Sequence, residues 1–198
     1  MKHLKLTFLL TALLSAVGAN IFAHDIAVKN SDGVTIYYVW TNNQTELAVS
    51  YQGGSYSSYS NEYSGAVVIP ESATYNGKSY PVTSIGELAF ADCSGLTSVT
   101  IPNSVTSIGY GAFEGTAWYN SQPDGLVYAG KVAYKYKGTM PANTGIVLEE
   151  GTLGIAGSAF RYCSGLTSVT IPNSVTSIGK YSHEIKDEAN MGTTPISA

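Results

Sequence analysis

The sequence predicts a mainly β protein with short helical turns, folded as a stack of short repeated coils. Three observations lead to this fold class. Residues 93–109 and 163–179 share the same seventeen letters, CSGLTSVTIPNSVTSIG, 70 positions apart. Phe90 and Phe113 end two IGxxAF phrases that lie 23 residues apart. Runs of Val, Ile and Thr, which favour strands, alternate with Gly, Asn and Pro, which favour turns.

The composition excludes several classes of protein. A chain of 198 residues suits one or two ordinary domains, and its hydrophobic content of 44% is too high for a disordered chain. The net charge is −4, whereas nucleic-acid binding requires clustered Lys and Arg, so we expect no nucleic-acid partner. Two cysteines can supply neither a disulfide-rich scaffold nor a Cys-only zinc site.

Residues 1–23 have the three-part pattern of a secretory signal peptide. Two lysines precede an apolar run over 6–17, and small residues follow as far as Ala23. Cleavage after Ala23 fits this pattern, and cleavage after Ala19 is an alternative. The apolar run has 12 residues where a bilayer span needs roughly 20, so a transmembrane anchor is the less favoured reading. We expect an exported chain, secreted or at the cell surface, with no membrane span in its mature part.

The repeat comprises three full units, at 82–104, 105–151 and 152–174. A partial unit lies at each end of this series. Phe160 ends a looser copy of the IGxxAF phrase 47 residues after Phe113, so the second unit carries an insertion of 24 residues. No single coil can enclose a core, and equivalent apolar side chains must therefore stack from unit to unit. We expect Phe90, Phe113 and Phe160 to form one buried file. A Ser/Gly-rich stretch before the first unit carries Tyr51, Tyr56, Tyr59 and Tyr63. We expect these tyrosines to cover the first unit, and ligand binding is the alternative.

The repeated phrases resemble a known family. Ser84-Ile85-Gly86, Ala89-Phe90, Cys93 and Leu96-Thr97-Ser98-Val99-Thr100-Ile101-Pro102, with copies at 107–116 and 154–179, are similar to the BspA-type leucine-rich repeat of bacterial surface and secreted proteins. The resemblance covers about residues 64–179. It implies a right-handed leucine-rich-repeat solenoid outside the cell that binds or adheres without catalysis. Ser104 departs from the pattern, because the family usually places Asn or Cys there.

Four segments follow from these patterns. After the signal peptide at 1–23 we expect an N-terminal β cap and partial repeat over 24–81, and repeats over 82–179 with an insertion hairpin at about 115–143. A polar tail, 180–198, follows. The tail contains no recognisable capping unit, so a natural short protein and a truncated fragment of a larger adhesin remain equal alternatives.

The two cysteines test the stacking geometry. Cys93 and Cys163 hold the same position in units that are two steps apart, with Thr116 in that position between them. Strands stack about 4.8 Å apart, which would separate the cysteines by about 10 Å, beyond the reach of a disulfide. We expect two buried thiols without a disulfide, serving as small apolar side chains.

Aromatic residues of the insertion are the candidate ligand-binding residues: Trp118, Tyr119, Tyr128, Tyr134 and Tyr136. Runs on either side of Ala129-Gly130-Lys131 predict a hairpin, on whose second strand Tyr134 and Tyr136 would share one face. Tyr and Trp contribute large contact areas with few torsions, and they also stack on sugar rings. The alternative is that these rings only cover an exposed flank of the stack.

Few other residues of the sequence suggest catalysis or metal binding. Glu149-Glu150 suits an exposed turn rather than a glycosidase pair, and His183 lies in the polar tail without a fixed scaffold for a metal. No nucleophile-elbow motif is present. We therefore expect no enzyme, no catalytic residue, no metal and no cofactor. The predicted function is a binding or adhesion module whose partner is a protein ligand or a surface glycan, with a carbohydrate-binding accessory protein as the alternative.

Overall fold

The computed structural model describes residues 24–53 and 62–182. The expected signal peptide and nearly all of the expected polar tail lie outside these residues. The described chain is mainly β with very little helix, as predicted. It contains one short α-helix, α1 (Ala117–Asn120), and one 3-10 turn, η1 (Asn42–Gln44).

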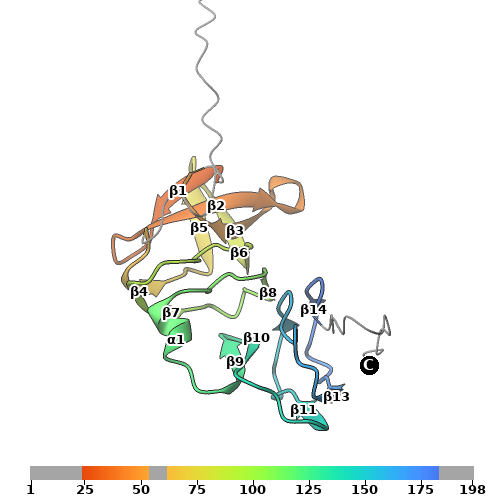
Figure 1. Cartoon of the computed structure of the whole chain (residues 1–198). Helices are drawn as coiled ribbons and strands as arrows, with labels where there is room; N and C mark the ends of the chain where they lie inside the picture. Colours follow the sequence, from red (N-terminus) through yellow and green to blue (C-terminus); the bar gives the residue numbers. More distant parts are fainter. Residues whose placement is uncertain (1–23, 54–61, 183–198) are drawn as a thin grey trace, which may run out of the picture.

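The strands of the first half, in chain order, are β1 (Ile26–Lys29), β2 (Thr35–Thr41), β3 (Glu46–Ser50), β4 (Gly65–Val68), β5 (Ser72–Tyr75), β6 (Lys78–Ile85), β7 (Leu96–Thr100) and β8 (Ser107–Ile108). Those of the second half are β9 (Gly125–Ala129), β10 (Val132–Lys137), β11 (Thr144–Val147), β12 (Gly154–Ile155), β13 (Leu166–Thr170) and β14 (Ser177–Ile178). In Figure 1, β1, β2 and β3 lie at the top of the molecule and β9 and β11 lie toward the bottom, while β14 stands to one side at about the height of β8.

Antiparallel pairing begins the chain and parallel pairing continues it. β1, β2 and β3 form antiparallel neighbours, and β3 then pairs in parallel with β6, which pairs in parallel with β8. The hairpin between β5 and β6 turns at Asn76 and Gly77, whose φ values are 50° and 77°. Both central residues of such a tight turn need positive φ, which Asn and Gly adopt more readily than other residues.

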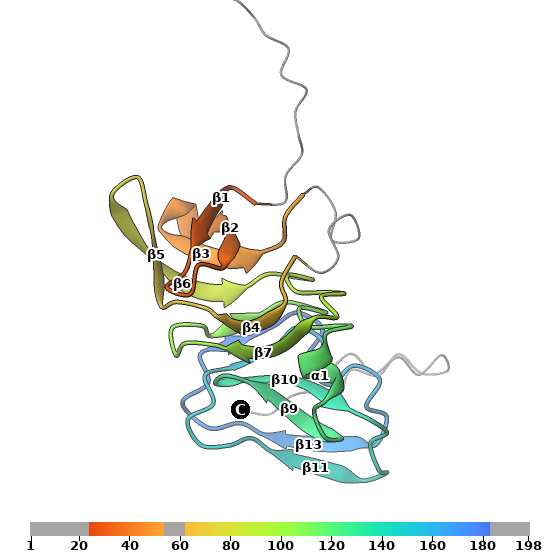
Figure 2. The ribbon, with the colours of Figure 1, turned by 90° about the vertical axis from the view of Figure 1, so that its left-hand side faces the viewer.

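Two further strand pairs line one side of the repeat units. β4 pairs in parallel with β7, and β11 pairs in parallel with β13. In Figure 2 the β4–β7 pair lies above the β9–β10 hairpin, and the β11–β13 pair lies below it. The hairpin therefore separates two groups of repeat strands that the sequence alone would place in one series.

A regular backbone ladder joins consecutive units. The Gly86 N–H donates to the Val49 carbonyl at 2.8 Å, the Gly109 N–H donates to Ile85 at 2.8 Å, and the Gly179 N–H donates to Ile155 at 2.8 Å. Each bond links the residue after a repeat Ile to the equivalent apolar residue of the preceding unit. This one-to-one register keeps equivalent side chains on the same face of successive units.

The register shifts by one residue where the hairpin enters. By analogy with Gly109, which bonds Ile85, the Ala156 N–H should reach the Ile108 carbonyl, but it donates instead to Ala133 of β10 at 2.9 Å. The next N–H along the chain, that of Gly157, donates to Ile108 at 3.0 Å. A shift of one residue turns side chains to the opposite face of a strand. Accordingly Ala156 lies in one core cluster and its neighbour Ile155 in another.

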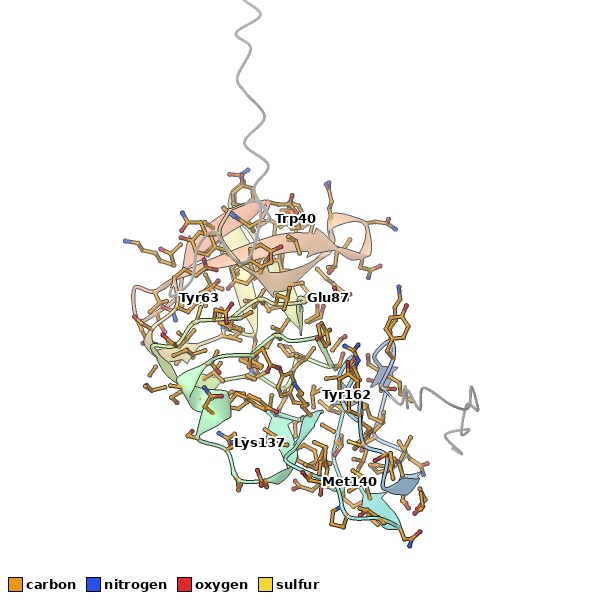
Figure 3. The ribbon with its side chains drawn as sticks, in the orientation of Figure 1. Trp40, Tyr63, Glu87, Lys137, Met140 and Tyr162 are labelled. Atoms are coloured by element: carbon orange, nitrogen blue, oxygen red, sulfur yellow. The ribbon has the colours of Figure 1, made fainter. Side chains whose placement is uncertain are left out.

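The expected single file of phenylalanines is wrong for this reason. Phe90 and Phe113 stack with ring centroids 5.1 Å apart, but Phe160 lies in the second cluster, with Ile155 and Cys163. The ring that follows Phe113 is that of Tyr134 from the insertion, with centroids 5.3 Å apart. Figure 3 labels Tyr63 in the part of the molecule that holds the first cluster and Met140 in the part that holds the second.

The aromatic file of the first cluster therefore runs Tyr63, Phe90, Phe113, Tyr134. Tyr63 is fully buried, and its ring centroid lies 4.6 Å from that of Phe90. Its hydroxyl donates to the Ser50 carbonyl at 2.8 Å. Both ends of the file thus combine an aromatic ring with a hydroxyl that contacts the backbone, a common requirement for a buried tyrosine.

The Tyr134 hydroxyl replaces a backbone carbonyl of the repeat. The Phe90 N–H donates to Ala112 at 2.8 Å and the Phe160 N–H to Ser182 at 2.9 Å, each in the next unit. The Phe113 N–H instead donates to the Tyr134 hydroxyl at 3.0 Å. The insertion displaces the carbonyl that would accept this bond, and a buried N–H without an acceptor is costly.

The prediction of two buried thiols without a disulfide is confirmed, although the two cysteines lie in different core clusters. Both thiols are buried, and no disulfide joins them. Cys93 lies in the first cluster and Cys163 in the second. Burial raises the pKa of the Cys163 thiol, which makes it a poor nucleophile near neutral pH.

A half-buried carboxyl lies beside the N-terminal sheet. The Gln52 N–H donates to Glu62 Oε1 at 3.0 Å, whereas Oε2 is buried without a hydrogen-bond partner among the described residues. Burial raises the Glu62 pKa to about 7, although the bond from Gln52 opposes this shift. The folded state therefore binds a proton at this carboxyl more tightly than the unfolded chain does.

The first prediction concerns the Tyr134 hydroxyl. Tyr134→Phe should lower the free energy of unfolding by about 1–3 kcal/mol, because it leaves the buried Phe113 N–H without an acceptor. Tyr119→Phe is the matched control, because the Tyr119 hydroxyl has no hydrogen-bond partner in the described part of the chain, and it should change stability by less than about 0.5 kcal/mol. Urea unfolding followed by tyrosine and tryptophan fluorescence measures both. Equal effects of the two variants would contradict this role of Tyr134.

The second prediction concerns pH. A folded pKa of about 7, above the ordinary value of 4.5, means that the folded state binds more protons than the unfolded state between these pH values. The Glu62 contribution to stability should therefore fall as pH rises from 4.5 to 7. Glu62→Gln retains an amide oxygen for the Gln52 N–H and should become more stable than the wild type as pH rises from 5 to 8. Thermal unfolding midpoints of both proteins measure this, and a difference independent of pH would refute it.

Candidate functional site

The insertion forms the hairpin that the sequence predicts. β9 and β10 pair antiparallel with Val132 opposite Ala129, and Gly130 at the turn has a φ of 61°. Gly130 also approaches the repeat closely, since a Cβ there would lie 3.0 Å from the Ile101 Cβ. The hairpin turn therefore packs against the end of a repeat strand.

The prediction that Tyr134 and Tyr136 share one face of the hairpin is wrong, because β10 contains a β-bulge. The pairing of β10 with β9 shifts between Ala133 and Lys135, so the strand does not alternate regularly through Tyr134. A bulge adds one unpaired residue and changes which side the following side chains face. Tyr134 lies in the first cluster, whereas Tyr136 packs against the second. The two tyrosines do not share one face.

Thr116 starts the segment that leads into the hairpin. It occupies the position held by Cys93 and Cys163 in other units, and its hydroxyl accepts the Tyr119 N–H at 3.0 Å. A threonine oxygen that accepts an N–H of the first turn is a helix N-cap, and α1 follows at once. At this position a threonine therefore begins a helix, where a cysteine in the other units fills the core.

Tyr119 and Tyr134 are internal residues. Only 6% and 2% of their surfaces are exposed, and their rings meet edge to face with centroids 5.6 Å apart. The ammonium groups of Lys135 and Lys137 lie 5.5 and 5.7 Å from the Tyr119 ring centroid. Burial raises the pKa of Tyr119 to about 12, and it raises the pKa of Tyr134 as well. Both hydroxyls are protonated at neutral pH.

The other three predicted residues are half-buried and do not converge on one surface. Trp118 packs against Phe113 of the first cluster, with ring centroids 4.7 Å apart. Tyr128 and Tyr136 pack against the second cluster, and the Tyr128 hydroxyl accepts the Glu149 N–H at 2.9 Å. Ligand contact by these three residues stays a prediction.

A small open hollow lies where the second unit, the hairpin and the third unit meet. Its lining residues include Tyr110 from the second unit, Lys135 from β10, and Ser158, Arg161 and Tyr162 from the third unit. Tyr110 and Tyr162 are 44% and 69% exposed, which is high for aromatic side chains. Figure 3 labels Tyr162 at this junction, beside the strands that follow the hairpin.

Arg161 is the cationic centre of the hollow. Its guanidinium carbon lies 4.6 Å from the Tyr162 ring centroid and 5.5 Å from that of Tyr110, within the range of cation–π attraction. Its Nε atom is buried and has no hydrogen-bond partner among the described residues. Lys135 lines the same hollow, but Glu114 binds its ammonium at 2.7 Å.

Sequence reasoning missed this hollow, although one signal was present. Arg161 is the only arginine of the chain. It follows a core phenylalanine at a position where the other units carry Ala91 and Glu114, so the repeat itself does not require it. The meeting of Tyr110 with Arg161 depends on the register shift at the hairpin, which the sequence does not reveal.

The described residues contain no group of three or more His, Cys, Asp or Glu side chains that could hold a metal ion. Within residues 24–53 and 62–182, no helix has the length and apolar character needed to cross a bilayer.

Three solved structures resemble the chain. The leucine-rich repeat protein of T. pallidum is 18% identical, with a TM-score of 0.36, and the match covers 78% of this chain and 65% of that one. A leucine-rich cell surface protein from Faecalibacterium prausnitzii is 23% identical, with a TM-score of 0.39 and coverages of 81% and 35%. A leucine-rich repeat protein from Bacteroides ovatus is 24% identical, with a TM-score of 0.33 and coverages of 73% and 42%. This chain thus spans less than two thirds of the length of each.

No curated protein matches the sequence. The model of the BspA-type leucine-rich repeat region matches residues 72–184 in six copies, which is more than half of the chain. This match confirms the resemblance that the repeated phrases indicate, and it includes both identical segments and the hairpin between them. The chain belongs to the BspA-type leucine-rich repeat family.

Proposed function

We propose that this protein is a non-enzymatic module that binds a protein partner outside the cell, in adhesion or a related surface interaction. Leucine-rich repeat regions commonly serve as protein-interaction modules, which agrees with the family of this chain. The leader pattern at 1–23 supports export to the cell surface or the surroundings. The proposed architecture is a right-handed solenoid whose first unit is covered by an N-terminal β cap over 24–81.

The observation that carries this proposal is the cluster around the hollow, in which the exposed rings of Tyr110 and Tyr162 flank the half-buried Arg161. Tyr and Arg are enriched among the few residues that dominate the energy of protein interfaces. Aromatic rings contribute large contact areas, and a guanidinium contributes several directed donors. The repeat stack does not need these side chains exposed, so their clustering supports a contact surface at this place.

The half-buried residues Trp118, Tyr128 and Tyr136 are secondary candidates for contact with the partner. The buried pair Tyr119 and Tyr134 would act only by holding the hairpin in place.

Carbohydrate binding is the second candidate function, favoured by the exposure of the tyrosine rings. Tyr162 and Tyr181 are 69% and 64% exposed, and a phenol ring offers a flat apolar face with a polar tip. Such faces stack on sugar rings. The exposed hydroxyl groups on β7 and β13, Thr97 and Thr167 among them, would add donors and acceptors for a glycan.

The third prediction tests the binding function. The full chain, immobilised for biolayer interferometry, should show saturable binding to at least one member of a panel of purified matrix and serum proteins. Parallel sensors carrying neutral and acidic glycans distinguish the two candidate functions, and the chain unfolded in urea and then immobilised is the control. Saturable binding to glycans alone would replace the protein-binding proposal. If the chain binds no protein or glycan of the panels and no peptide of a random library, both candidate functions are refuted.

A further inference from the structure

We propose that the hollow around Arg161 is a receptor for a single carboxylate, an Asp or Glu side chain of the protein partner that lies beside an apolar or aromatic side chain. This inference rests on the proposed function and adds the location and chemistry of the contact. The carboxylate would bond the Arg161 guanidinium, and its apolar neighbour would pack on the exposed ring of Tyr162 or Tyr110.

The first argument is charge. Arg161 and Lys135 line the hollow, and Glu114 is ion-paired with Lys135. The ion pair between Lys135 and Glu114 at 2.7 Å leaves those two groups neutralised. No carboxylate lies within ion-pair distance of Arg161 in the described part of the chain. Among the described residues, the charge of the Arg161 guanidinium therefore has no ion-pair partner.

The second argument is the unsatisfied hydrogen-bonding capacity of Arg161. A guanidinium has five N–H donors, and a carboxylate accepts two of them in parallel. The cation–π contacts with Tyr110 and Tyr162 use the charge of the group but none of its N–H donors. Nε is already buried without an acceptor, so the folded protein has lost hydration at this atom and gained no bond in return. An incoming carboxylate would bond the two Nη groups of the guanidinium, because Nε itself is closed to solvent.

The third argument is that the two tyrosines hold the guanidinium in place. A long side chain loses rotamer freedom when it binds, and this loss weakens binding. Two aromatic rings at 4.6 and 5.5 Å already restrict the position of the Arg161 guanidinium. Binding therefore loses little further entropy at Arg161, because its side chain is already ordered in the unbound protein.

The fourth argument limits the partner to one carboxylate rather than an acidic run. The chain has a net charge of −4, so its overall field repels strongly acidic partners. Lys135, the other cation that lines the hollow, is already paired with Glu114, so a second carboxylate would meet no unpaired cation among the lining residues. A peptide with one acidic residue flanked by aromatic or aliphatic residues fits both conditions.

The fourth prediction uses a random-peptide display library selected on the full chain. Selected peptides should carry one Asp or Glu next to an aromatic or aliphatic residue. Arg161→Gln should weaken binding of a selected synthetic peptide by about tenfold or more, because it removes a charge-assisted hydrogen bond. Tyr162→Asn, which suits the φ of 64° at this position, should weaken it less. Fluorescence polarisation of the labelled peptide measures each affinity.

Lys131→Gln is the matched control, because it removes one positive charge from the exposed hairpin turn without touching the hollow. It should leave the peptide affinity within about twofold, and the thermal unfolding midpoint should show that each variant folds. Peptide binding that Arg161→Gln leaves unchanged would overturn the carboxylate receptor while leaving the binding function in place. Peptides without an acidic residue, or Arg161-dependent binding of acidic glycans but of no peptide, would also overturn it.

Discussion

The buried backbone N–H of Phe113 needs a hydrogen-bond acceptor. This need is the constraint on which the junction between the repeat stack and the inserted hairpin depends. In the other repeat units this N–H reaches a carbonyl of the next unit, as Phe90 reaches Ala112. The insertion keeps the third unit out of that place. The Tyr134 hydroxyl supplies the acceptor and its ring extends the aromatic file, so one side chain restores both the bond and the packing. The insertion can therefore enter the stack without leaving an unsatisfied buried donor.

The division of the core follows from the same junction. Because Ala156 bonds β10, the register between the second and third units moves by one residue, and the side chains of the third unit face a different interior. A second cluster then forms around Phe160 and Cys163. Close packing accompanies this shift, since a Cβ at Gly154 would lie 2.0 Å from the Thr106 carbonyl oxygen. A glycine at this position is required by the approach of two backbones.

The candidate site is a product of the junction. Tyr110 belongs to the second unit, whereas Arg161 and Tyr162 belong to the third, and they meet because the hairpin sets the spacing of these units. The sequence correctly predicted the hairpin and the buried thiols. It misplaced Phe160 and the shared face of Tyr134 and Tyr136, because a register shift and a bulge leave no periodic signal. It did not indicate the hollow, because residues 51 positions apart in the chain form it.

The two identical segments separate what the sequence alone determined from what the tertiary structure decided. Both copies form the same strand, β7 and β13, followed by the same short strand, β8 and β14, so local structure follows from the letters. Burial does not. Ile108 is 1% exposed, with β6 paired on one side and the Gly157 N–H bonded to its carbonyl on the other. Its copy Ile178 is 52% exposed, on a strand with one described neighbour. Backbone propensity acts within a segment, but burial depends on which segment lies beside it, and only the folded arrangement decides that.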